Sequence, residues 1–556
     1  MRRKKIGIIL AASFLVMIVL TGCYCYEIYL DYRVPVPYTG RIMSVPVVED
    51  LDFLEGKEKC FAETNPGVCF GGALLPYTED GTLYLSQDFA VEEWIGEITA
   101  DTRDKFLCTL YDPAWEDKAG SIRDNHIFTL WLVDGENYYE LSMTVCGMPV
   151  MTISTQREEQ QDLGDYDTDP DRFIYDPSVI YYGQMQLFDP GVGTGQYEIM
   201  EFGVRYHERG ASALSPEKKG YSIGLLDAGG ENFDASLLGM RSDNSWKLKG
   251  LGSDSSRIRE KTAYQIWEQF ALANTEVNEA GPHMEYLELI MDNDYAGLYG
   301  IIEPVDEKKL ELDKNDVLYK MTNWFVPTEE EIQTSIDNKW RIATYIRIRY
   351  PDEIADYEEA WYPMRDYLDT FYQEGVDVRE YQGSSYQGGG DGRPAENKVY
   401  LSNAMDVLLF NMAVSGCDNY YKNMYFAADV AEDGTYVMRQ IPWDLDLTFG
   451  ETYTVGFNDD ETVVYEEAAI PFLRDKSPQL VRPSLKERWG AYREGFLSTE
   501  NIEKLLCENR DYLLCAGVNG RENARWPQYS MTDNIDGMLD YQERRMNWLD
   551  EYFNMF

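Results

Sequence analysis

The sequence has very little histidine and few basic residues for its length. Among 556 residues there are three histidines (His126, His207 and His283), and 50 Lys and Arg stand against 98 Asp and Glu. A histidine-based metal site or a Ser-His-Asp triad is therefore poorly supplied. The formal net charge of -48 would repel a phosphate backbone or an anionic membrane surface. We expect no nucleic-acid partner, and chemistry that runs on carboxylates, amides, Lys and Arg.

Several common signatures are also missing. The nine Cys follow no zinc-binding spacing, and there is no internal repeat and no G-x-G-x-x-G loop. If the chain is exported, disulfides are allowed. Cys60 with Cys69, and Cys108 with Cys146, are then candidate pairs, although spacing does not fix their connectivity.

The first residues have the form of a secretion signal. A basic "MRRKK" precedes the apolar run "IGIILAASFLVMIVL" and then "LTGC", which is short for a membrane span. Thr21 and Gly22 before Cys23 resemble the lipobox of bacterial lipoproteins, and this resemblance implies cleavage before Cys23 and lipidation of its sulfur. An uncleaved anchor helix is the alternative. Either reading predicts an extracytoplasmic chain tethered to the cell membrane.

The chain is long enough for two or three domains. We predict a signal peptide over residues 1–22 and a spacer over 23–45. Short alternating strands separated by Gly, Asp and Asn turns predict a β-rich, sandwich-like domain over 46–175, ending in an acidic linker at 157–173. A second domain, 176–556, opens with strands and continues with helices, so the expected fold class is α+β.

Within the second domain, a helix is predicted over 254–274, with Asp254 and two serines at its start as N-cap candidates. Its apolar face carries Ala263, Ile266, Trp267 and Phe270. A hairpin with its turn at residues 292–294 follows, and an apolar helix is predicted over 398–416. We therefore expect a β-rich lobe over about 176–310 and a helical lobe over about 311–556.

The stretch from Asp418 to Asp446 carries the strongest chemical signal. Asn423 lies five residues after Asp418, and "NMYFAADV", "AEDG" and "TYVMRQIPW" predict a hairpin that returns to Asp444. A hairpin brings its two ends together, and carboxylate and amide oxygens suit Mg²⁺. Asp446 lies two residues further on. This arrangement matches the needs of phosphoryl transfer, which are metal-held phosphates and an acid near the acceptor hydroxyl.

Five blocks of the chain, in order, resemble the CotH kinase family, an atypical protein-kinase-like group. They are "RYHERGASALSPEKKGYSIGLL", "WKLKGLGSDSSRIREKTAYQIW", "LELIMDNDYAGLYGIIEPVD", "DNYYKNMYF" and "IPWDLDLTFG". The resemblance implies a two-lobed kinase-like fold, binding of ATP with Mg²⁺ or Mn²⁺, and phosphorylation of protein Ser or Thr at a cell surface or spore coat.

The resemblance also assigns roles. Asp418 becomes the catalytic acid, Asn423 and Asp444 metal ligands, and Asp446 an accessory ligand. The nucleotide-binding candidates are Gly210 and Ser212 in a loop over the phosphates, Lys219, Lys247 and Arg259 for phosphates or a helix acid such as Glu260, and Glu303 at a hinge. Lys249 is an equal alternative to Lys247, because both flank Leu248 on one strand face.

Two other functions fit the same residues. The kinase-like domain of a surface protein can act as a non-catalytic scaffold or an adhesive module, with the β-rich domain displaying binding loops. A metal site of this kind would also serve transfer of a nucleotidyl group. All three acid and amide positions, Asp418, Asn423 and Asp444, are present, which favours the catalytic reading.

Overall fold

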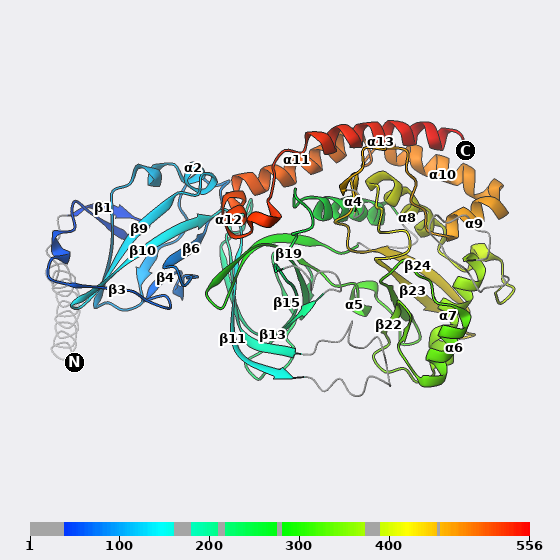
Figure 1. The fold of residues 1–556 in the computed structure, drawn as a ribbon, viewed down its shortest axis with the longest axis horizontal. Helices are drawn as coiled ribbons and strands as arrows, with labels where there is room; N and C mark the ends of the chain where they lie inside the picture. The colour runs from blue at the N-terminus through cyan, green and yellow to red at the C-terminus, as the bar shows by residue number, and fades with distance from the viewer. Residues whose placement is uncertain (1–37, 161–178, 210–216, 275–280, 373–389, 453–455) are drawn as a thin grey trace, which may run out of the picture. The chain divides into compact units, whose positions relative to one another are not determined.

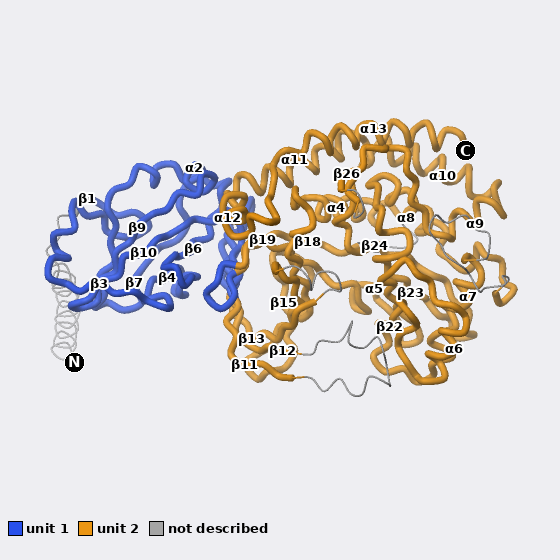
Figure 2. Tube along the Cα trace, in the orientation of Figure 1, with its two compact units in different colours: residues 1–152, 187–200, 290–295 blue, residues 153–186, 201–289, 296–556 orange. Residues whose placement is uncertain are grey.

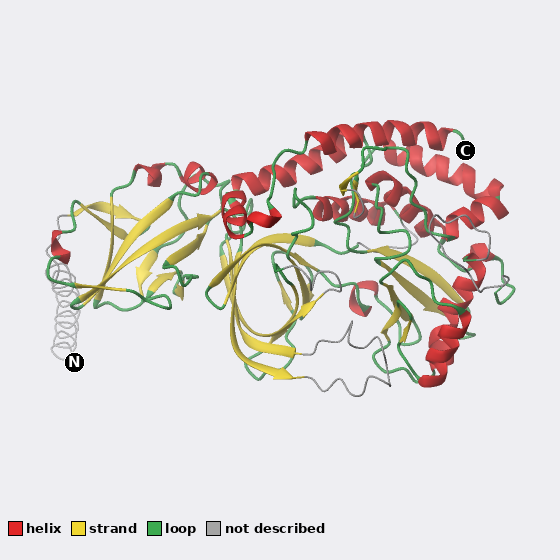
Figure 3. Cartoon of the chain, in the orientation of Figure 1, coloured by secondary structure: helices red, strands yellow, loops and turns green. Residues whose placement is uncertain are grey.

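The computed structural model describes residues 38–160, 179–209, 217–274, 281–372, 390–452 and 456–556, which form helices and strands in similar measure (Figures 1 and 3). Two compact units divide the chain (Figure 2). Unit 1 contains residues 1–152, 187–200 and 290–295, and unit 2 contains the rest. Cys23, Gly210 and Ser212 lie outside the described residues. The mixed α and β composition and the β-rich N-terminal region agree with the sequence prediction.

Unit 1 contains two sheets that share one apolar core. Val68 and Phe70 of the small sheet lie in the same buried cluster as Leu83, Leu130 and Met143 of the large one, as in a sandwich. The large sheet comprises β1 (Tyr38–Ile42), β2 (Val45–Val48), β8 (Lys105–Leu110), β9 (Ile127–Asp134), β10 (Asn137–Cys146), β3 (Glu58–Cys60) and β6 (Thr82–Ser86), and the small one β5 (Ala73–Leu74), β4 (Val68–Phe70) and β7 (Ile98–Ala100). Its helical turns are η1 (Asp52–Leu54), η2 (Pro113–Glu116) and α2 (Lys118–Arg123).

The candidate disulfides do not form, since none of the seven cysteines of the described segments is in a disulfide. Cys108 lies on β8 and Cys146 on β10, and β9 pairs with both of these strands. Two strand spacings separate them, which is more than a disulfide spans. Cys60 lies on β3 of the large sheet and Cys69 on β4 of the small one. Burial raises the pKa of the Cys108 thiol to about 12, so this thiol stays protonated.

Unit 2 begins with a closed barrel. Alternation explains it: Tyr206 and Trp246 are buried, while their neighbours His207 and Lys247 point to the opposite face. The barrel order is β11 (Val150–Gln160), β12 (Val179–Asp189), β13 (Glu198–Arg209), β14 (Gly220–Leu226), β17 (Ser245–Lys249), β19 (Asp294–Ile302) and β18 (Met284–Met291). β11 continues to Gln160, so residues 157–160 of the predicted linker are strand.

The hairpin β18–β19 turns at Asp292 and Asn293, both with positive φ, as predicted. A short pair, β15 (Ala235–Ser236) with β16 (Ser242–Asp243), lies beyond β14 in the chain.

A five-stranded sheet follows in the region predicted to be mainly helical. Its order is β21 (Ile342–Ala343), β22 (Ile346–Tyr350), β20 (Val317–Met321), β23 (Met424–Val430) and β24 (Tyr436–Pro442). Of these strands, β23 and β24 were predicted from the sequence as a hairpin. The strands β20 and β22 were not predicted. The helices here are α5 (Glu307–Leu310), α6 (Glu329–Asn338), α7 (Tyr357–Phe371), η4 (Ala395–Asn397) and α8 (Leu401–Val414).

The remaining elements complete the C-terminal part of unit 2. They are β25 (Glu451–Thr452), β26 (Gly456–Phe457), α9 (Ala469–Lys476), α10 (Pro478–Arg493), α11 (Thr499–Cys515), α12 (Val518–Arg525), η5 (Pro527–Tyr529) and α13 (Asp536–Asn554).

The predicted helix 254–274 is α4 (Arg259–Ala273), with all four predicted apolar residues buried. Asp254 lies before the helix and accepts a hydrogen bond from the Arg259 amide at 2.9 Å. From α11, Asn509 donates to Thr262 at 2.9 Å.

The C-terminal helices also hold the barrel. Glu522 of α12 accepts from Lys218 at 2.5 Å and from the Leu298 amide at 2.9 Å. Side chains far apart in sequence thereby fix α4 and the barrel to the same helical segment.

None of the helices in the described ranges is long and apolar enough to cross a membrane. The predicted signal and lipidation segment lies before residue 38 and is not tested by this finding.

Candidate active site

The hairpin β23–β24 brings Asn423 and Asp444 together at its open end. Met424 pairs with Pro442, and the Trp443 amide donates to the Asn423 carbonyl at 2.9 Å. Asn423 and Asp444 both have positive φ, at 57° and 62°. Asn and Asp tolerate this left-handed conformation better than other side chains except glycine. The residue types that suit a metal site therefore also suit the backbone here.

Asp418 lies in the turn after α8 with one carboxylate oxygen held and the other unpaired. Its Oδ2 accepts from Lys422 Nζ at 2.8 Å and from Asn423 Nδ2 at 2.7 Å. Its Oδ1 is buried and has no hydrogen-bond partner. Burial raises the pKa of Asp418 to about 6, against the lowering effect of Lys422. A buried, unpaired oxygen with a raised pKa is suited to accept a proton from a hydroxyl.

Lys249, at the end of β17, gathers three acids. Its ammonium donates to Asp444 Oδ1, lies 2.8 Å from Glu260 Oε2 of α4, and lies 3.5 Å from Asp446 Oδ2. Burial alone would raise the pKa of Asp444, but the Lys249 charge outweighs it and holds that pKa well below its usual range. Burial also opposes the charge on Lys249, yet the surrounding acids raise its pKa well above normal.

Asp446 supports this group from the loop after β24. Its Oδ2 accepts from Ser253 Oγ at 2.6 Å. Burial and the neighbouring Asp444 charge raise the pKa of Asp446. The Tyr264 hydroxyl of α4 completes the support, because it accepts from the Asp444 amide at 3.1 Å.

The structure distinguishes Lys249 from Lys247, which the sequence left as equals. Lys247 donates to Ser222 Oγ at 3.1 Å, and it is Lys249 that pairs with Glu260. Pairing of Lys247 with this helix acid is therefore wrong. The reason is register, since Lys249 is one step nearer the strand end that meets α4. The prediction of Lys247 as a phosphate ligand is not tested by these contacts.

The other predicted nucleotide-binding residues that the structure describes pair with side chains other than Asp418, Asp444 and Asp446. Lys219 lies 3.9 Å from Glu208, Arg259 pairs with Asp254 and Glu451, and Glu303 pairs with Lys309 at 2.6 Å. The structure does not bring these three side chains to the Asp418–Asp444 site. Nothing in the sequence indicates these partners. One of them, Glu451, is 192 positions from Arg259.

The carboxylates of Asp444 and Asp446 and the amide of Asn423 are the candidate donors for a metal ion. Across the ranges that the structure describes, no group of three or more His, Cys, Asp or Glu is arranged to hold one. The Lys249 ammonium, however, already lies between the carboxylates of Asp444 and Asp446, so these two acids converge on one cation. With the Asn423 amide beside them, their oxygens fit Mg²⁺ or Mn²⁺ by type.

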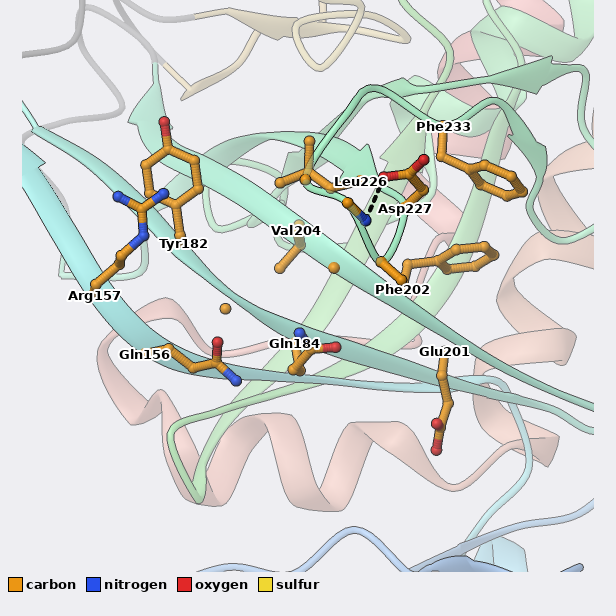
Figure 4. A pocket seen from close by; sticks show the side chains of 15 residues that line it. Gln156, Arg157, Tyr182, Gln184, Glu201, Phe202, Val204, Leu226, Asp227 and Phe233 are labelled. Carbon is orange, nitrogen blue, oxygen red and sulfur yellow. Dashed lines mark hydrogen bonds between the residues drawn. The ribbon is translucent and has the colours of Figure 1, made fainter.

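A separate surface groove of ≈ 790 Å³ opens on the barrel (Figure 4). Arg157 stacks on Tyr182 at 3.8 Å from its ring centre, and Phe202 lies 5.8 Å from Phe233 between ring centres. None of Asp418, Lys249 or Asp444 lines it, so the groove is not the site of the predicted chemistry.

Comparison with known proteins gives one match that covers the part of the chain containing this site. The family model described as CotH kinase protein matches residues 206–549, more than half of the chain, and this range includes Lys249, Glu260, Asp418, Asn423 and Asp444. No curated protein matches the chain. By this match the chain belongs to the CotH kinase family, which indicates a kinase-like function.

Proposed function

We propose that this protein is an exported, lipid-anchored kinase that transfers the γ-phosphate of ATP to Ser or Thr of surface or spore-coat-type proteins. The barrel and the five-stranded sheet with its helices would be the two lobes of a kinase-like fold. The observation that carries the proposal is the buried Asp418 carboxylate, whose Oδ2 is fixed by Lys422 and Asn423 while Oδ1 is unpaired.

The residues divide the work of phosphoryl transfer. Asp418 Oδ1 accepts the proton of the acceptor hydroxyl while the hydroxyl oxygen forms a bond to the γ-phosphorus. ADP leaves with the electrons of the broken P–O bond. Asn423 and Asp444, with Asp446 in support, would hold Mg²⁺ or Mn²⁺, which neutralises phosphate charge when bound.

The Lys249–Glu260 pair fixes a charge for the phosphates. Its geometry corresponds to the strand-lysine and helix-glutamate pair of protein kinases. Because α11 and α12 hold α4 and the barrel through Thr262, Lys218 and Leu298, Glu260 is held beside Lys249 without an added activator.

The test is label transfer by the full-length chain. We expect transfer from γ-labelled ATP to Ser or Thr of surface-protein extracts with Mg²⁺ or Mn²⁺, and loss of at least a hundredfold in Asp418→Asn, consistent with loss of a general base. Asp433→Asn, in the exposed turn of the same hairpin, is the matched control and should keep its activity. Absence of ATP binding by calorimetry would reject the kinase and support the scaffold.

A further inference from the structure

A cluster of positive side chains lies beside Asp444, apart from Lys249. Lys320 Nζ lies 5.1 Å from the Tyr425 ring centre and 5.3 Å from that of Trp443. Arg209 approaches the same Trp443 ring at 5.8 Å. Besides Arg209, two more cations, Arg349 and Lys247, act electrostatically on Lys320. We call the four the basic cluster: Arg209 of β13, Lys247 of β17, Lys320 of β20 and Arg349 of β22.

The basic cluster has no acidic ion-pair partner among the residues that the structure describes. Within the described ranges, none of its members forms an ion pair, although the chain has about twice as many acids as bases. The acids that act on Lys247, Asp243 and Asp306, both pair with Arg241, at 2.5 and 2.8 Å. Asp444 is the acid on which Arg209 and Lys320 act, and it forms no ion pair with either of them in the described structure.

Gathering these cations costs stability. Burial and the charges of Arg209 and Arg349 lower the pKa of Lys247 to about 7. The same causes, in the same order, lower the pKa of Lys320 well below its usual value. Arg209, Lys247 and Lys320 are partly buried and Arg349 is exposed. Like charges brought together where solvent is partly excluded are unfavourable, and such arrangements are common at functional sites.

The cluster acts on Asp444 and is not among the charged groups that act most on Asp418. Tyr425 is two residues beyond Asn423 along β23, about 7 Å further along the strand. The Asp444 carboxyl is affected by the charges of both Arg209 and Lys320. The charged groups that act on Asp418 are instead Lys422, Asp444 and Asp446.

We propose that the basic cluster is a binding site for phosphate groups beside Asp444. Two Lys and two Arg supply many N–H donors to phosphate oxygens, and Arg can bind them bidentately. A neutral purine would leave these charges unpaired. The phosphates come either from the nucleotide that the cleft binds or from a separate phosphate-bearing ion. The inference extends the proposed function but does not depend on catalysis.

The test is calorimetric titration of the full-length chain with inorganic tripolyphosphate, a probe that carries no base. Wild type should bind, and Lys320→Met and Arg349→Met should each weaken binding at least tenfold. Lys314→Met, in an exposed position before β20, changes the net charge equally and should bind like wild type. Thermal unfolding of each variant checks the fold, and we expect Lys320→Met to be at least as stable as wild type.

Two further arms separate the sources. If saturating ATP blocks tripolyphosphate, the nucleotide's own phosphates occupy the cluster; if both bind together, the ion is a separate one. No binding by wild type, or equal loss in Lys314→Met, would overturn the phosphate site. Label transfer from ATP is measured on the same samples. The phosphate-site hypothesis can therefore be rejected while the kinase hypothesis is supported, and the reverse.

Discussion

Lys249 and Lys247 lie two residues apart on one face of β17, yet they should respond in opposite ways to the same substitution. Lys249→Met removes the one ammonium shared by Glu260, Asp444 and Asp446. Lys247→Met removes one charge from a cluster of like charges that has no acidic partner in the described structure. Both changes delete one positive charge and keep an apolar stem of similar length.

The expected changes in the free energy of unfolding follow from the surroundings of each lysine. Breaking a buried ion pair costs about 3–5 kcal/mol, and because the Asp444 side chain is 37% exposed, we expect about 3 kcal/mol for Lys249→Met. The pKa of Lys247 falls from 10.5 to about 7, and one pKa unit corresponds to about 1.4 kcal/mol. The side chain is only partly buried, so solvent reduces this figure, and we expect Lys247→Met to stabilise by roughly 1–2 kcal/mol.

The assay is urea unfolding at pH 7, followed by tryptophan fluorescence. The urea concentration at the unfolding midpoint should fall for Lys249→Met and rise for Lys247→Met. Because the folded pKa of Lys247 is lowered, the unfolded chain binds the extra proton between pH 7 and about 10.5, and wild type gains stability as pH rises through that window. The advantage of Lys247→Met should therefore shrink toward pH 10. Midpoints that move in the same direction would refute the assignment of the two lysines.

Other consequences are open to direct measurement. Lys422→Met removes the charge that lowers the pKa of Asp418, so the acid limb of the phosphorylation rate, expected near pH 6, should move to higher pH; an unmoved limb would show that Lys422 does not act on this acid. Glu522→Gln leaves Lys218 and Arg257 buried without their carboxylate. The free energy of unfolding, measured by thermal unfolding, should therefore fall by roughly 3–5 kcal/mol. An unchanged transition would mean that α12 does not hold the barrel.

Local patterns predicted much of the site. The hairpin β23–β24, its turn and the approach of Asn423 to Asp444 follow from strand alternation and from the turn residues between them. The apolar face of α4 and the turn at Asp292 and Asn293 are also local. In each case, the residues that determine the geometry are neighbours in sequence.

What the sequence did not predict depends on distant contacts. The strand β20 carries Lys320 into the sheet beside β23, but more than 100 residues separate them, and nothing in "DVLYKM" indicates that partner. Strand alternation places Lys247 and Lys249 on one face but cannot say which meets Glu260. The cysteine spacing suggested pairs that the strand order places apart.

The charge of the whole chain makes the basic cluster more informative. A net charge of -48 opposes the approach of a polyphosphate over the Debye length, about 30 Å at 0.01 M salt and about 8 Å at 0.15 M. The cations around Trp443 act within a few ångströms, where salt screens less. We therefore expect the association rate of Mg·ATP, measured by stopped flow, to rise between 10 and 150 mM salt, in roughly the range over which the Debye length shortens. A rate that falls with salt over this range would mean that the local cations, and not the net charge, control the approach.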